Sequence, residues 1–286
     1  MEKATKSEIK SLRDGAPNKG FKVIVTGKGG AGKTTTTSLL AQAFIEKNYN
    51  VLAVDEDPQI NLPFSLGYPI EKMNAITPLS RNIDYIEEKI GVKPGAWGAF
   101  LKLNPSVDDV VERFGLKIND HLKTLVMGTI THPATGCLCP ENALLDAVIR
   151  HIALRKNELI LLDTQAGVEH FGRALAKGFS QCVIVTDSTF NAMSVATHSL
   201  NLAKEIGIPF IHLVINRADE KSKARAIKLL QQLGKSEQDF HSVFYLPVEN
   251  KILDHEPSVI DFYHNNLNSA LVKTIRKFAA ILECCK

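Results

Sequence analysis

Eight residues near the start of the chain combine the residue types that bind phosphate groups. Residues 27–34 match the spacing G-x-x-x-x-G-K-[ST], after an apolar run suited to a strand and before a helical pattern. The glycines let backbone N–H groups converge on an anion, and the helix start adds the positive end of its dipole. We therefore expect ATP or ADP to bind here, through Gly27, Gly29, Gly30, Ala31, Gly32, Lys33, Thr34 and Thr35.

Within this loop, two side chains are expected to act directly on the nucleotide. Lys33 reaches the outer phosphates, and the Thr34 hydroxyl can ligate Mg²⁺. A glycine-rich turn with an incidental lysine is the alternative, but it does not explain the strand and helix on either side.

Acidic residues directly follow two other apolar runs. The run 51–54 ends in Asp55-Glu56-Asp57, and the run 159–162 ends in Asp163. The carboxyl ends of parallel strands form the ligand edge of a doubly wound sheet, where carboxylates can hold Mg²⁺ or position a water. We expect Asp163 to assist Mg²⁺ and Gly167 to act as the hinge of a switch that senses the γ-phosphate. For 55–62, a polar turn with no nucleotide role is the alternative.

Cys137 and Cys139 form a C-x-C pair directly before the helical pattern of 141–155. Two thiolates can share a metal, but they do not complete a tetrahedral site. Two copies of the pair across a twofold axis supply four sulfurs, which suit Zn²⁺ or Ni²⁺. Spacing alone leaves a second interpretation equally open, in which these are reduced cysteines in a turn with no metal.

The pattern of elements predicts an α/β fold with a doubly wound, mostly parallel sheet of about seven strands, of the P-loop NTPase type. The strands are expected at 23–25, 51–54, 125–127, 159–162, 182–186, 210–216 and 243–246. We expect an N-terminal arm at 1–20, with a short helix at 7–13, and one ATPase domain at 21–286. An insert at about 67–121, with helices at 83–90 and 107–114, is expected to build a partner surface.

Composition narrows the function classes. The net charge of +3 is too small to indicate a nucleic-acid partner, and no apolar run reaches the length of a membrane span. The N-terminus lacks an apolar signal region, so we expect a cytoplasmic protein. An amphipathic pattern at 267–282 fits either a membrane interface or a helix packed on the sheet, and we favour packing.

Lys28, directly after the first glycine, makes the loop resemble the deviant phosphate loop of one P-loop branch. That branch includes the nitrogenase iron protein, the Min-type and partitioning ATPases, and metal-insertion ATPases. The resemblance implies that Lys28 reaches the nucleotide of the other subunit in a homodimer. It also implies that Asp57 orients the attacking water with support from Asp55, so the expected catalytic residues are Lys28, Lys33 and Asp57.

The end of the run 210–216 carries a further resemblance to this branch. Asn216 and Arg217 resemble its adenine-binding segment, and Pro247 and Glu249 occupy the place of its second base-contacting loop. The resemblance therefore implies that these four residues bind the adenine base.

A closer resemblance rests on 103–109, 126–129, 136–143 and 163–170, which are similar to the carbon monoxide dehydrogenase maturation ATPases (the CooC family). It implies an ATP-dependent dimer whose paired C-x-C motifs bind nickel, or zinc, for a client carbon monoxide dehydrogenase or acetyl-CoA synthase. One alternative is a positioning ATPase acting on membrane or DNA. Another is an electron-transfer ATPase like the nitrogenase iron protein, which Cys137 and Cys139 fit poorly because they are too close together.

Overall fold

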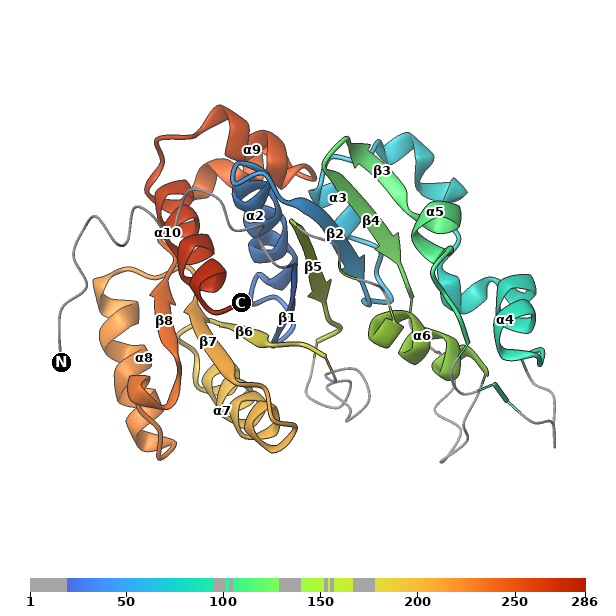
Figure 1. Ribbon diagram of the computed structural model, residues 1–286. Coiled ribbons are helices and arrows are strands. Elements are labelled where there is room, and N and C mark those ends of the chain that lie inside the picture. Colours follow the sequence, from blue (N-terminus) through green and yellow to red (C-terminus); the bar gives the residue numbers. More distant parts are fainter. Residues whose placement is uncertain are drawn as a thin grey trace, which may run out of the picture.

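One sheet of eight strands organises the described part of the chain (Figure 1). The computed structural model describes residues 20–94, 101–102, 105–128, 140–151, 154, 157–166 and 178–286. The helix expected at 7–13 and the site residues Cys137, Cys139 and Gly167 lie outside these ranges. The division into an arm, a domain and an insert stays a prediction.

The strands run in the order β3-β4-β2-β5-β1-β6-β7-β8, and every neighbouring pair is parallel except β3 with β4. Their bounds are Phe21–Gly27 (β1), Asn50–Asp55 (β2), Leu116–Asn119 (β3), Leu122–Val126 (β4), Glu158–Asp163 (β5), Gln181–Thr186 (β6), Phe210–Ile215 (β7) and Ser242–Tyr245 (β8). Strands β1 and β6 are buried throughout, which explains why they are almost continuously apolar. The doubly wound, mostly parallel sheet is confirmed.

The expected count of about seven strands misses β3. This strand has four residues at the sheet edge, alternates between half-buried and exposed positions, and follows α5 (Val110–Phe114) after one residue. Its pairing with β4 depends on the short turn at Asp120 and His121. So short an edge strand carries little apolar signal of its own, because none of its four side chains is fully buried.

Helices cover both faces of the sheet (Figure 1). One face packs against α2 (Lys33–Ile45), α3 (Leu62–Ser65), α9 (Val259–Asn265) and α10 (Ala270–Cys284). The other packs against α4 (Ile83–Ile90), α5, α6 (Pro140–His151), α7 (Phe190–Glu205) and α8 (Glu220–Gln232). Short 3₁₀ turns are η1 (Ile70–Ala75), η2 (Leu79–Arg81), η3 (Glu237–Asp239) and η4 (Asn250–His255).

The C-terminal amphipathic pattern belongs to a packed helix. Leu271, Ile275, Phe278 and Leu282 of α10 are buried in the same cluster as α2. Leu267 precedes the helix and is 42% exposed. The apolar face of α10 is therefore committed to the protein interior, as we favoured from the sequence.

Lys22 ties the start of β1 to the end of α6. Its side chain is buried, and Nζ donates hydrogen bonds to the carbonyl oxygens of Ile149 at 3.1 Å and Arg150 at 3.4 Å. A cation here offsets the negative end of the helix dipole. Burial lowers the pKa of Lys22. The end of α6 thus lies beside the first residues of β1. The first residue of α6 therefore lies toward the other end of the strands, where β1 ends.

We expect Lys22→Met to destabilise the fold by about 1–3 kcal/mol, because the variant keeps the apolar stem but leaves buried helix carbonyls without their donor. Urea unfolding measures the change. Lys47→Met is the matched control: Lys47 pairs with Glu283 at 2.7 Å but is 31% exposed, so its loss should cost under about 1 kcal/mol. Equal losses in the two variants would contradict a special role for Lys22.

Candidate nucleotide-binding site

The predicted phosphate loop lies between β1 and α2 at the carboxyl edge of the sheet, in a conformation that requires glycine at two positions. Gly27 has φ 143°, and a Cβ there would lie 2.0 Å from the carbonyl oxygen of Val185. Gly32 has φ 99°, and its Cβ would lie 2.2 Å from Nδ2 of Asn216. The first and last glycines of the motif therefore let the loop approach β6 and the end of β7 closely.

A cavity of about 540 Å³ opens beside this loop. Its walls are the phosphate loop and the start of α2, residues of the segment 57–61, Gln165 with Ala166, and Arg217. Lys33 lines it and is buried; burial lowers the pKa of its ammonium group, and Asp163 and Asp57 oppose this shift. The structure thus brings the predicted residues Gly29, Gly30, Thr34 and Thr35 to one cavity with Lys33.

Thr34 and Asp163 are in direct contact. Thr34 Oγ1 donates a hydrogen bond to Asp163 Oδ2 at 2.6 Å. Asp163 Oδ1 is buried and has no hydrogen-bond partner in the part of the chain that the structure describes. Burial is the main cause that raises the pKa of Asp163 to about 7, with Asp57 adding to it and Thr34 and Lys33 opposing it. A buried carboxylate oxygen beside a hydroxyl fits the oxygen donors that Mg²⁺ prefers.

Asp55 and Asp57 occupy different environments. Asp55 is fully buried, and its two oxygens accept the backbone N–H groups of Asp57 at 3.0 Å and Leu62 at 3.1 Å. Asp57 lines the cavity, and its Oδ1 accepts the N–H of Gln59 at 2.9 Å. Asp55 therefore fixes the segment that presents Asp57 to the cavity; the catalytic roles of both residues stay predictions.

The residues predicted to bind adenine separate into two groups. Asn216 and Arg217 contact the phosphate loop, and Arg217 also lines the cavity. Pro247 and Glu249 are not among the described residues that line it, and Glu249 Oε1 instead accepts the N–H of Lys251 at 3.3 Å. Their adenine role, like the role of Lys28 across a dimer, stays a prediction.

Sequence reasoning gave no role to several residues of the cavity wall. Gln59, Asn61 and Gln165 line it, and each lies within a few residues of a predicted aspartate. Glu56 is buried beside them, and burial, followed by the charges of Asp163 and Asp55, raises its pKa to about 8. Their positions after strands β2 and β5 are the signal that places them at the ligand edge.

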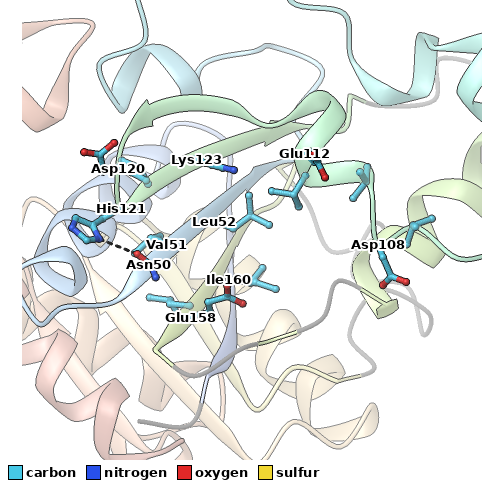
Figure 2. A pocket seen from close by; sticks show the side chains of 15 residues that line it. Asn50, Val51, Leu52, Asp108, Glu112, Asp120, His121, Lys123, Glu158 and Ile160 are labelled. Carbon is cyan, nitrogen blue, oxygen red and sulfur yellow. Dashed lines mark hydrogen bonds between the residues drawn. The ribbon is translucent and has the colours of Figure 1, made fainter. Parts of the chain in front are cut away.

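A larger cavity, of about 610 Å³, lies at the opposite edge of the sheet (Figure 2). The starts of β2 and β5, the β3–β4 turn and α5 line it, and His121 Nδ1 lies 2.9 Å from Asn50 Oδ1. Figure 2 shows Asp108, Glu112 and Lys123 around it. It contains neither the glycine-rich loop nor the strand-end carboxylates. The smaller cavity is therefore the candidate nucleotide site, because of its chemistry rather than its size.

The described cysteines do not form a metal site. No group of three or more His, Cys, Asp or Glu side chains suited to a metal occurs within the described ranges, and Cys137 and Cys139 fall outside them. Cys182 is buried in β6, and Cys285 Sγ lies 3.2 Å from His241 Nε2. The metal assignment therefore depends on the sequence.

Gly32→Ala tests the fit between the loop and β7. The added methyl group would collide with Asn216, so we expect at least a tenfold loss of ATP affinity by calorimetry. Gly207→Ala is the matched control, because Gly207 has φ 82° and a Cβ there meets nothing within 4 Å. In the control, backbone strain alone should lower the free energy of unfolding by about 1–2 kcal/mol, and the variant should bind ATP normally. Normal ATP affinity in Gly32→Ala would contradict the close packing.

The carboxylates predict a pH effect on the nucleotide-free protein. The pKa of Asp163 is raised in the folded state, so between pH 4 and 7 folding takes up a proton. Stability from this group therefore falls as pH rises through that window, by up to about 1.4 kcal/mol per pH unit, and levels off above pH 7. We expect urea unfolding to show that the parent loses stability relative to Asp163→Asn as the pH rises from 5 to 7.

Buried His212, whose pKa is lowered to about 3, contributes the opposite slope. It contributes equally to both proteins and cancels in the difference. A difference that stays constant across this pH range would contradict the buried, protonated state of Asp163.

Comparison with known proteins shows the family of the chain. Over 199 residues the chain is 38% identical to the carbon monoxide dehydrogenase accessory protein CooC of Rhodospirillum rubrum. The alignment covers 69% of this chain and 74% of that protein. It is 35% identical over 236 residues to an uncharacterised ATP-binding protein of Methanocaldococcus jannaschii, covering 82% of this chain and 88% of that one.

The fold resembles solved structures of lower identity. The cell division ATPase MinD of Pyrococcus furiosus aligns with a TM-score of 0.64 and 18% identity, covering 93% of this chain and 99% of that one. This similarity concerns the fold alone. Residues 22–252 match the family described as the CobQ/CobB/MinD/ParA nucleotide binding domain. The chain is therefore a P-loop ATPase that belongs to this family and is a homologue of CooC.

Proposed function

We propose that this chain is a dimeric, ATP-dependent maturation factor that carries a metal ion, nickel in preference to zinc, to a client carbon monoxide dehydrogenase or acetyl-CoA synthase. The observation that supports it most is the 38% identity to the accessory protein CooC, together with the C-x-C pair at Cys137 and Cys139.

The placement of the neighbouring elements supports a link between this pair and the nucleotide. Cys139 directly precedes Pro140, the first residue of α6. Because the end of α6 is tied to Lys22 at the start of β1, its first residue lies toward the edge where β1 ends in the phosphate loop. β4 ends at Val126, in register with Asp55, and so leads toward the same edge. The chain on both sides of the cysteine pair thus lies toward the nucleotide edge.

The proposed reaction is hydrolysis of ATP to ADP and phosphate. Lys33 binds the outer phosphates, and the N–H groups of the loop bind the remaining oxygens. Thr34 and Asp163 would hold Mg²⁺, which neutralises charge on the phosphates when bound. Asp57, fixed by Asp55, orients the attacking water, and Lys28 of each subunit reaches the nucleotide of its partner. The chain's own part is to position these groups, since phosphoryl transfer depends mainly on positioning and electrostatics.

Two elements would convert the nucleotide state into a change at the metal. Asp57 belongs to a segment held at β2, and Gly167 follows β5 four residues after Asp163. A dimer that closes over ATP brings two C-x-C pairs together, and hydrolysis separates them. Metal release to the client then follows opening.

A membrane-positioning function receives less support. The apolar face of α10 is buried against α2 rather than available to lipid. In the described ranges, every helix is too short or too polar to cross a bilayer. The similarity to MinD concerns the fold and does not favour this alternative.

Metal titration tests the proposal. With a non-hydrolysable ATP analogue, we expect the parent to bind about one Ni²⁺ or Zn²⁺ per two chains, because four sulfurs complete one tetrahedral site. The Cys137→Ser/Cys139→Ser variant should lose this binding. Cys284→Ser is the matched control, since Cys284 is exposed at the end of α10, and it should bind as the parent does. Equal metal binding by the double variant and the parent would refute the cysteine site.

A further inference from the structure

We propose that Asn216 and Arg217 hold the phosphate loop in its anion-binding shape, and so position the phosphates in addition to any contact with the base. We call these two residues the β7 latch, because they directly follow β7. The inference rests on the proposed nucleotide site and adds to it two positioning residues whose effect should not require adenine.

The β7 latch donates to two consecutive carbonyl groups of the loop. Asn216 Nδ2 donates to the carbonyl oxygen of Ala31 at 2.9 Å, and the Arg217 guanidinium donates to that of Gly30. A loop that binds an anion must turn its N–H groups toward it and keep its carbonyl oxygens away. Donors held on the carbonyl side favour that orientation before any ligand arrives. The guanidinium also lines the cavity, so its positive charge is available to phosphate.

The β7 latch is itself fixed to the sheet on both sides. The N–H of Asn216 donates to Thr186 of β6 at 2.7 Å, and the N–H of Ala218 donates to Leu246, after β8, at 2.8 Å. Asn216 Oδ1 accepts the N–H of Arg217 at 2.9 Å. The turn thus has little freedom to move away from the loop.

Arg217 has an unfavourable backbone conformation. Its φ is 52°, in the left-handed region that non-glycine residues rarely occupy. Such a conformation persists only where the surroundings impose it, and it is common at functional sites. A glycine at position 217 would relieve this backbone strain. It would also remove the guanidinium that donates to the carbonyl oxygen of Gly30 and lines the cavity.

An adenine contact alone does not account for these bonds. The Asn216 amide already uses its oxygen on Arg217 and one N–H on Ala31. A base-only function requires neither bond to the loop. The two interpretations differ in one measurable way: the latch acts on any ligand with a phosphate chain, whereas a base contact acts only on ligands with adenine.

Calorimetry with Mg·ATP and with Mg·tripolyphosphate, which has no base, separates them. Asn216→Ala removes the donor to Ala31 without adding a charge to the site. We expect it to weaken both ligands by about tenfold. Arg217→Gly should weaken both ligands similarly, while its thermal midpoint stays equal to or above that of the parent because the left-handed strain is removed. A lower affinity in a protein of undiminished stability cannot come from a general structural defect.

Glu249→Gln is the contrast on the base side, because the resemblance assigns Glu249 to the base and it does not line the cavity among the described residues. It should leave tripolyphosphate affinity unchanged. The β7 latch is refuted if Asn216→Ala and Arg217→Gly lose affinity for ATP but bind tripolyphosphate as the parent does. Failure of the parent itself to bind ATP would instead refute the proposed nucleotide site, so the two failures are distinguishable.

Discussion

Negative charge at one edge of the sheet is the constraint on which the site depends. The pairing of β2 with β5 places Asp55 in register with Asp163, and Glu56 and Asp57 follow directly. Lys33 is the buried cation that opposes them. Carboxylates so close together in a buried environment cannot all remain charged without a cation, so their pKa values rise. A divalent cation brought with a nucleotide would relieve this repulsion.

The glycine-rich loop meets the same constraint from the other side. A phosphate chain adds further negative charge, so the loop must supply positive potential through N–H groups, the start of α2 and Lys33. This requires the loop to lie close to β6 and to the end of β7. Val185 and Asn216 there leave no room for a side chain at Gly27 and Gly32. The geometry that accepts phosphate is therefore set by strands far from the loop in sequence.

The sequence was sufficient where function is local. The phosphate loop, the strand-end aspartates and the parallel sheet follow from motifs and from runs of apolar residues, and the structure brings Lys33, Thr34, Asp57 and Asp163 together. It was insufficient where function depends on distant contacts. The hydrogen bond from Asn216 to Ala31 joins residues 185 positions apart, and no local pattern encodes it. The edge strand β3 was missed for a different reason: it has only four residues, and none of them is fully buried.

A row of backbone hydrogen bonds gives the proposed coupling a physical route. The N–H of Glu56 donates to Asp163 at 3.0 Å, and the N–H of Met127 donates to Asp55 at 2.8 Å. The carbonyl of Met127 in turn accepts the N–H of Ser80 of η2 at 3.0 Å. Displacement of β2 by its carboxylates would therefore move β4 and η2 with it, because packed strands shift as units rather than deform. Gly128 is the last described residue before the segment that carries the cysteines. A change in charge at Asp163 can thus be transmitted along backbone hydrogen bonds as far as Met127 and η2.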